Sequence, residues 1–99
     1  MKAKQSRIER IDELICRLKE IKPEIKKLIE WTQCSDVREL ENRIHFLRYD
    51  REKAKGHDQL YSDYNQRVMS FEWTRSCVAE LERERDVINI KLNDLNYSH

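Results

Sequence analysis

The 99-residue sequence contains only one glycine and one proline, and this scarcity excludes several kinds of protein. A sheet protein needs many turn residues, so the chain is not built from short strands and hairpins. A phosphate-binding loop needs several glycines that let backbone amides approach the phosphate, whereas Gly56 stands alone. The apolar runs are only a few residues long, far short of the about 20 residues that span a membrane.

Cysteine is also scarce, with Cys16, Cys34 and Cys77 widely spaced and odd in number. There is no Cys-x-x-Cys pair and no nearby histidine, although a tetrahedral zinc site normally shows a closely spaced ligand pair. We therefore expect reduced, unliganded cysteines, no metal and no cofactor. The segment after Lys4 is charged where a signal peptide needs an apolar stretch, so we expect a cytoplasmic protein.

Charged residues, by contrast, make up 39% of the chain and apolar residues 38%, a balance typical of long helices in one domain. The net charge is +1, but it is unevenly spread. Residues 1–57 carry 15 basic and 11 acidic groups, and residues 58–99 carry 5 and 8. This difference favours folding of the first part of the chain back onto the second.

An apolar repeat of seven residues runs from Leu60 to Leu95 without an intervening glycine or proline. Such a repeat predicts one helix over 58–96, about 58 Å long, with a seam for another helix. A compact domain of this size has a radius of gyration near 13 Å, so helices from this chain or a second copy must lie along it. The predicted oligomer seam consists of Leu60, Tyr64, Phe71, Val78, Leu81, Arg85, Ile88, Leu92 and Leu95.

Polar residues interrupt this seam at Arg67, Thr74 and Arg85. Polar core positions can fix the register or the oligomeric state of paired helices. Arg85 has two interpretations: it pairs with an acid of a neighbouring helix, or its stem lies along the seam while the guanidinium reaches water.

A first helix is predicted over 6–31, with Ser6 as N-cap and Glu9 at the capping-box spacing. Its apolar stripe is wide enough for two neighbouring helices. The stripe holds Ile11, Leu14, Leu18, Ile21, Ile25 and Leu28, flanked by Ile8, Ile15 and Ile29. Pro23 lies on the outer face, where it predicts a kink; a new helix starting at Pro23 is the alternative.

A second helix is predicted over 36–55, because the apolar phase fails around 31–36 and Asp36 with Glu39 resembles a helix start. A short turn before Asp36 is favoured over a continuous helix. Glu30-Trp31-Thr32 recurs as Glu72-Trp73-Thr74, through either duplication or chance. A duplication would question the turn, since its counterpart lies inside the long helix.

The second helix becomes basic towards its end, before Gly56 offers a left-handed cap. Cations are favoured at a helix C-terminus by the macrodipole. Two other roles are pairing with Asp58 or Asp63 and contact with a phosphate backbone. The basic side chains are Arg43, Arg48, Arg51, Lys53 and Lys55.

Met69, Trp73 and Val87 lie roughly opposite the seam of the long helix. They form either a second contact surface, since tryptophan often anchors interfaces, or a face covered by the other two helices.

Together these patterns predict a single all-α domain over 1–99, a long-helix hairpin or three-helix coiled-coil-like bundle, and a homodimer. No catalytic arrangement is present, so we expect a non-enzymatic module that docks on a larger protein as an adaptor, inhibitor or assembly chaperone. The predicted partner-binding residues are Met69, Trp73, Arg48, Arg51, Lys53 and Lys55. The alternative is a nucleic-acid-associated protein that uses the basic end of the second helix.

Overall fold

The structure, a computed structural model, describes residues 7–95 and contains three helices within them. They are α1 (Arg7–Glu30), α2 (Val37–Lys53) and α3 (Asp58–Asp94). The prediction of an all-α fold is confirmed, and the bounds differ from the predicted ones by only one or two residues. The predicted N-cap at Ser6 lies outside the described residues.

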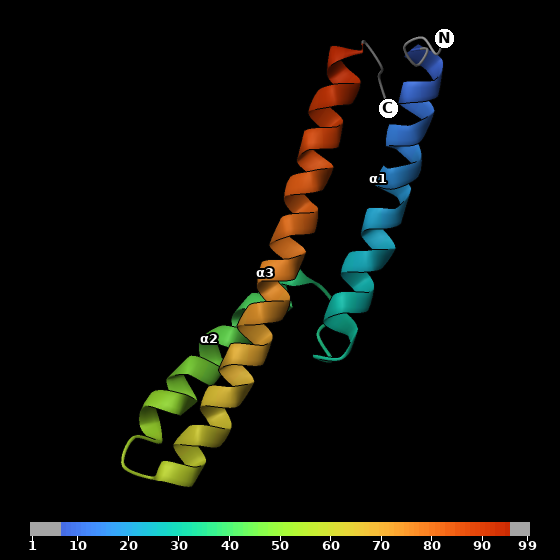
Figure 1. Ribbon diagram of the computed structural model, residues 1–99. Helices are drawn as coiled ribbons and strands as arrows, with labels where there is room; N and C mark the ends of the chain where they lie inside the picture. The colour runs from blue at the N-terminus through green and yellow to red at the C-terminus, as the bar shows by residue number, and fades with distance from the viewer. Residues whose placement is uncertain (1–6, 96–99) are drawn as a thin grey trace, which may run out of the picture.

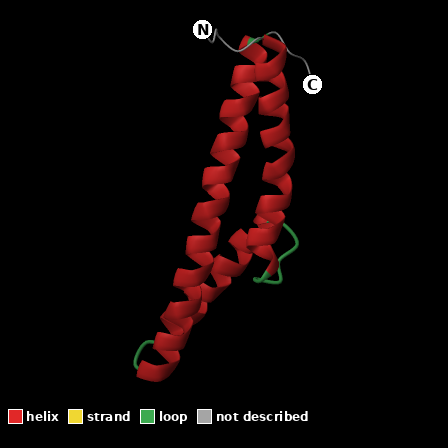
Figure 2. Ribbon diagram, turned by 45° about the vertical axis from the view of Figure 1, so that its right-hand side comes forward, coloured by secondary structure: helices red, strands yellow, loops and turns green. Residues whose placement is uncertain are grey.

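The two shorter helices lie one after the other along α3, and both run antiparallel to it (Figure 1). At any level along α3, therefore, the molecule is essentially two helices thick, as the second view also shows (Figure 2). The result is a rod of 66 × 28 × 20 Å with a radius of gyration of 19.4 Å. A compact domain of this length would measure about 13 Å, so much of the helix surface faces no other helix of the chain.

Helix α1 packs on the C-terminal part of α3 through the predicted apolar stripe. Ile21, Ile88 and Leu92 form the buried centre of this contact. A single neighbouring helix cannot cover a stripe this wide, so its margins stay half-buried. The half-buried residues are Ile11, Leu14, Ile15, Leu18 and Ile25. Pro23 lies inside the uninterrupted helix, so the alternative of a new helix at Pro23 is wrong.

The turn between α1 and α2 occupies residues 31–36, as predicted. The Asp36 side chain accepts a hydrogen bond from the Glu39 backbone N–H at 2.8 Å, and Glu39 in turn accepts one from the Ser35 N–H at 2.5 Å. Gln33 adopts a left-handed conformation, with φ of 63°. The chain thereby leaves one side of α3 and joins another, which is why the apolar phase changes here.

The largest buried cluster lies at the junction of all three helices. Ile29 of α1, Leu40 and Ile44 of α2, and Val78 of α3 pack together with Cys34 of the turn. Leu40 and Val78 are completely buried. Beyond this junction α2 and α3 form a hairpin, closed by a loop in which Gly56 has the predicted left-handed conformation, with φ of 93°.

Candidate interaction surfaces

An aromatic patch lies at the level where α1 ends. It consists of Trp31, Met69 and Trp73, which together with Ser70 line one shallow hollow. The exposed fractions of the three side chains are 52%, 59% and 62%. The interpretation that α1 or α2 covers Met69 and Trp73 is therefore wrong. Although α1 and α2 both adjoin α3 at the nearby junction, neither helix covers these two side chains. Val87 is also exposed, but it lies about four turns beyond Trp73 along α3 and so outside this patch.

Trp31 is held in place by two contacts with α3. Its indole Nε1 donates a hydrogen bond to the Thr74 hydroxyl oxygen at 3.1 Å, and its ring packs edge-on against Phe71 with centroids 5.0 Å apart. Thr74 is completely buried, and its hydroxyl donates to the Ser70 carbonyl at 3.1 Å. The polar interruption at Thr74 thus fixes the position at which α1 ends against α3.

A groove continues below Trp31 along the N-terminal part of α3. Its upper part is a cavity of about 570 Å³ between the turn, α2 and α3, with Trp31, Arg43, Leu47, Arg67 and Phe71 in its wall. A second hollow, lined by Leu60, Asp63, Tyr64 and Arg67, extends it towards the start of α3. Both hollows share Asp63 and Arg67, so they form one groove, which we call the seam groove.

The predicted seam is therefore divided between two environments. In the C-terminal part of α3, Val78, Ile88 and Leu92 are buried within the chain itself and Leu81 and Leu95 are half-buried. In the N-terminal part the seam faces the groove: Leu60 is 49% exposed, and Tyr64 and Phe71 are half-buried. Its use between copies of the chain stays a prediction.

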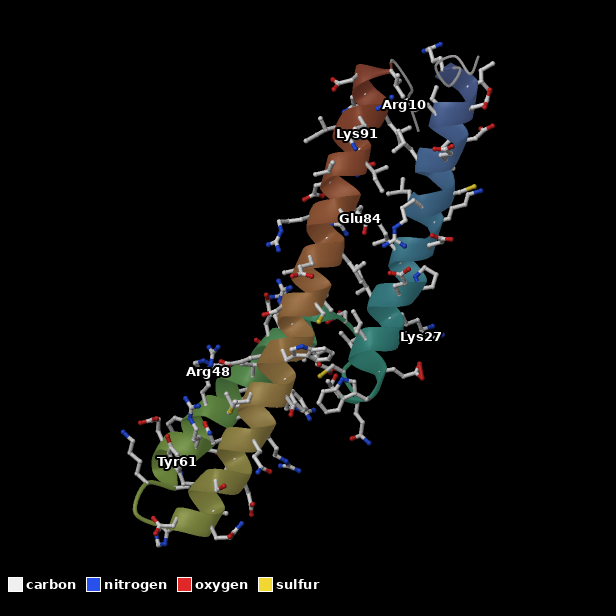
Figure 3. The ribbon with its side chains drawn as sticks, viewed as in Figure 1. Arg10, Lys27, Arg48, Tyr61, Glu84 and Lys91 are labelled. Carbon is white, nitrogen blue, oxygen red and sulfur yellow. The ribbon has the colours of Figure 1, made fainter. Side chains whose placement is uncertain are left out.

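The basic end of α2 is largely engaged within the chain. Arg48 forms an ion pair with Glu72, and Arg51 donates to the Asn65 side-chain oxygen at 3.0 Å. Lys53 lies 5.3 Å above the Tyr49 ring centre. Figure 3 shows Arg48 beside α3 and Tyr61 near the tip of the hairpin.

Lys55, which lies in the loop after α2, pairs with Glu52 at 2.9 Å. This hydrogen bond holds the pKa of Glu52 below its usual value. Neither Asp58 nor Asp63 takes part in an ion pair among residues 7–95. The prediction that these cations pair with them is therefore wrong. The antiparallel hairpin brings Glu72 and Asn65 to the levels of Arg48 and Arg51, while Asp63 accepts a hydrogen bond from Gln59.

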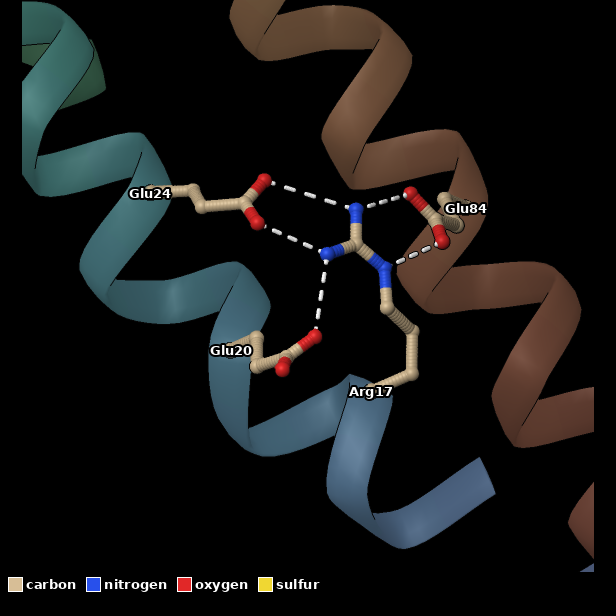
Figure 4. Close-up of polar contacts among 4 residues, drawn as sticks. All are labelled: Arg17, Glu20, Glu24 and Glu84. Carbon is tan, nitrogen blue, oxygen red and sulfur yellow. Dashed lines mark hydrogen bonds and ion pairs between the residues drawn. The ribbon is translucent and has the colours of Figure 1, made fainter. Parts of the chain in front are cut away.

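A charged cluster that the sequence did not reveal joins α1 to α3 (Figure 4). The Arg17 guanidinium contacts Glu84 of α3 with two hydrogen bonds of 2.5 and 2.7 Å. It also contacts Glu24 at 2.7 Å and Glu20 at 3.3 Å. These carboxylates raise the pKa of Arg17, chiefly through Glu84, and the bond from Arg17 lowers the pKa of Glu84.

Arg85, next to Glu84 in sequence, is exposed, and among residues 7–95 it forms an ion pair with Asp86 of its own helix alone, at 3.5 Å. Arg85 therefore pairs with no other helix among residues 7–95, and its pairing with a helix of a second copy stays a prediction. At this level of α3, the cation that crosses between helices is Arg17 of α1, which lies beside the apolar stripe and points at Glu84 (Figure 4).

The three cysteines lie apart as free thiols: Cys16 is exposed, Cys77 half-buried and Cys34 buried. Residues 7–95 contain no group of three or more His, Cys, Asp or Glu side chains arranged to hold a metal ion. Within the same range, no helix has both the length and the apolar character needed to cross a membrane.

Neither a protein-family model, nor a curated protein, nor a solved structure matches this chain. The surfaces described above are therefore the basis for the functional argument.

Proposed function

We propose that the protein is a small non-enzymatic interaction module that docks on a larger protein partner through helix packing at the aromatic patch. The observation that supports this proposal most strongly is the exposure of Trp31, Met69 and Trp73 side by side. Single exposed apolar residues are ordinary, but adjoining ones at this density are typical of interaction sites. Tryptophan is also among the residues that dominate binding energy in interfaces.

The patch is held ready for binding. Trp31 is fixed by Thr74 and Phe71, so the ordering of this side chain costs little on association. Trp73 and Met69 are one turn apart on a continuous helix. We expect a partner that offers an apolar groove or helix face, in which Trp73 inserts and Trp31 forms one wall.

The alternative of nucleic-acid binding has less support. Phosphate contacts require cations that can give up their present partners, and Arg48 and Lys55 are ion-paired while Arg51 is bonded to Asn65. Exchange of such pairs for phosphate would gain less than the use of unpaired cations.

Affinity capture with matched variants tests the proposal. The tagged chain is exposed to lysate of the source cells under reducing conditions, with half of the sample treated with nuclease. Wild type is compared with Trp73→Ser and with Phe46→Ser, since both aromatic side chains are 62% exposed but Phe46 lies on α2, outside the patch.

We expect one nuclease-resistant protein in stoichiometric yield, lost with Trp73→Ser and retained with Phe46→Ser. Equal capture by both variants would contradict the role of the patch. A catch that disappears on nuclease treatment would instead favour the nucleic-acid alternative.

A further inference from the structure

The seam groove has a different occupant from the aromatic patch. We infer that a second copy of this chain packs antiparallel along it, so that α2 and the N-terminal part of α3 from each copy form a four-helix core. The groove adjoins the aromatic patch at Trp31, which lines both, but the inference does not depend on the proposed partner.

The first argument is the amount of exposed surface. The chain has an accessible surface of 7639 Å² and a mass of 12.2 kDa. A compact monomer of that mass exposes about 6,100 Å², so the rod exposes about 1,500 Å² more. This excess is spread over the whole length of the rod, and a stable interface of standard size needs about 800 Å² of it on each partner.

The second argument is that the groove continues an apolar seam that another helix covers elsewhere. Towards the C-terminus, α1 buries Ile88 and Leu92. In the N-terminal part the same repeat presents Leu60, Tyr64 and Phe71 to the groove instead. Heptad positions of this kind are filled by a helix when packed, and α1 has already ended at Glu30.

The third argument, which selects a second copy over another helix, is that the pattern along the groove is self-complementary when reversed. In an antiparallel pair of α3 helices with Tyr64 at the level of Arg67 of the second copy, Leu60 lies at the level of Phe71. In the same register, Asp63 of one copy lies within one residue, about 1.5 Å along the helix axis, of the level of Arg67 of the second copy. A two-fold axis repeats each of these contacts, as an isologous interface requires.

The described contacts leave the required groups available. Arg67 is exposed and takes part in none of the ion pairs among residues 7–95, while Asp63 accepts a bond only from the exposed Gln59 amide. The cavity of about 570 Å³ beside Trp31 and Phe71 has room for a leucine side chain. In this register Leu60 of the second copy enters it.

Sedimentation velocity on the full chain under reducing conditions tests the inference by charge reversal. Asp63→Arg places two like-charged pairs in the dimer, and so does Arg67→Asp. An equimolar mixture of the two variants restores opposite charges at both sites. Glu80→Arg is the control, because this exposed residue lies about 140° around α3 from Arg67.

We expect a wild-type dimer, a loss of about tenfold or more in association constant for each single variant, and recovery to within about threefold in the mixture. Glu80→Arg should dimerise like wild type. All three substituted side chains are exposed, and unchanged helical circular dichroism checks that the fold is intact.

A wild-type chain that sediments as a monomer would overturn the inference. A dimer that is insensitive to both reversals, or that is weakened by both without rescue in the mixture, would also overturn it, because the interface would then lie elsewhere or have another register. None of these outcomes affects the capture experiment with Trp73→Ser, so the two proposals fail independently.

Discussion

Helices α1 and α2 both pack antiparallel on α3, but they are held to it in different ways. The α1 contact is aliphatic, with only Ile21, Ile88 and Leu92 at its buried centre, and it is flanked by the Arg17–Glu84 cluster. The α2 contact is shorter, but it adjoins the three-helix junction and is crossed by Arg48–Glu72 and Arg75–Glu41. Two packed helices bury little apolar surface by themselves. Each contact therefore also depends on the ion pairs and the junction residues at its edges.

The junction should matter most, because Val78 supports both contacts. Val78→Ala is expected to lower the free energy of unfolding by about 2 kcal/mol, from the lost burial of two methyl groups and the remaining cavity. Val87→Ala is the matched control on the same helix. Val87 is 47% exposed, so its loss should stay within about 0.5 kcal/mol. Urea unfolding measures both; similar losses would contradict the central role of the junction.

Each of the two interhelical connections contains one residue in a left-handed conformation, where glycine is favoured. Removal of the glycine at one and introduction of a glycine at the other should change stability in opposite directions. Gly56→Ala forces a side chain into a left-handed conformation and should cost about 1 kcal/mol, although nothing lies within 4 Å of the new Cβ. Gln33→Gly relieves the same strain in the turn before α2 and should stabilise the chain by roughly 0.5 kcal/mol. Thermal unfolding of both variants gives the sign. A stabilising Gly56→Ala would contradict the geometry of the hairpin loop.

The Trp31–Thr74 hydrogen bond should affect local order more than stability. Thr74→Val removes the acceptor of the indole N–H while keeping the shape, with an expected loss of up to about 1 kcal/mol, since the half-exposed indole can turn to water. In a Trp73→Phe background, acrylamide quenching of Trp31 fluorescence should increase. Unchanged quenching would show that Phe71 alone positions the ring.

Acid should loosen the α1 contact selectively. The folded pKa of Glu84 is lower than its ordinary 4.5 because Arg17 donates to the carboxylate. A lowered folded pKa means that the stabilisation is present above the unfolded pKa and is lost as the pH falls through the folded value. Hydrogen-exchange protection factors, which correct for the pH dependence of the intrinsic rate, should therefore fall more in α1 than in α2 at acid pH.

Arg17→Met should reduce that acid dependence, whereas Arg10→Met, which changes an exposed cation of the same helix, should leave it in place. An equal acid response in all three proteins would show that other carboxylates control the contact.

The sequence predicted the helices well, because their signals are local. The apolar stripes, Asp36 with Glu39, and Gly56 each report on a few neighbouring residues, and the helix bounds followed from them. The contacts between helices were less accessible. Thr74 was recognised as a polar seam position, but its partner Trp31 lies 43 residues away and depends on where α1 ends.

The candidate surfaces illustrate the same limit. Met69 and Trp73 were singled out from their place on the helix, but whether another helix covers them depends on the side of α3 that α2 occupies. Arg17 and Glu84 are 67 residues apart in sequence, so their pairing depends on the register of α1 against α3. The many charges of the chain would allow numerous similar pairs in other registers. The Glu-Trp-Thr echo shows this most directly, because Thr32 lies in a turn and Thr74 in a helix.

The serial placement of α1 and α2 also determines how the molecule would respond to force. Arg7 donates a hydrogen bond to the Leu95 carbonyl at 2.9 Å, so the two ends of the described chain lie together at one end of the rod. Tension applied between these ends would unzip α1 from α3 one turn at a time, rather than shear the whole contact at once. Extension would pause at the junction around Val78, where resistance is concentrated, before the α2–α3 hairpin opened as a second step.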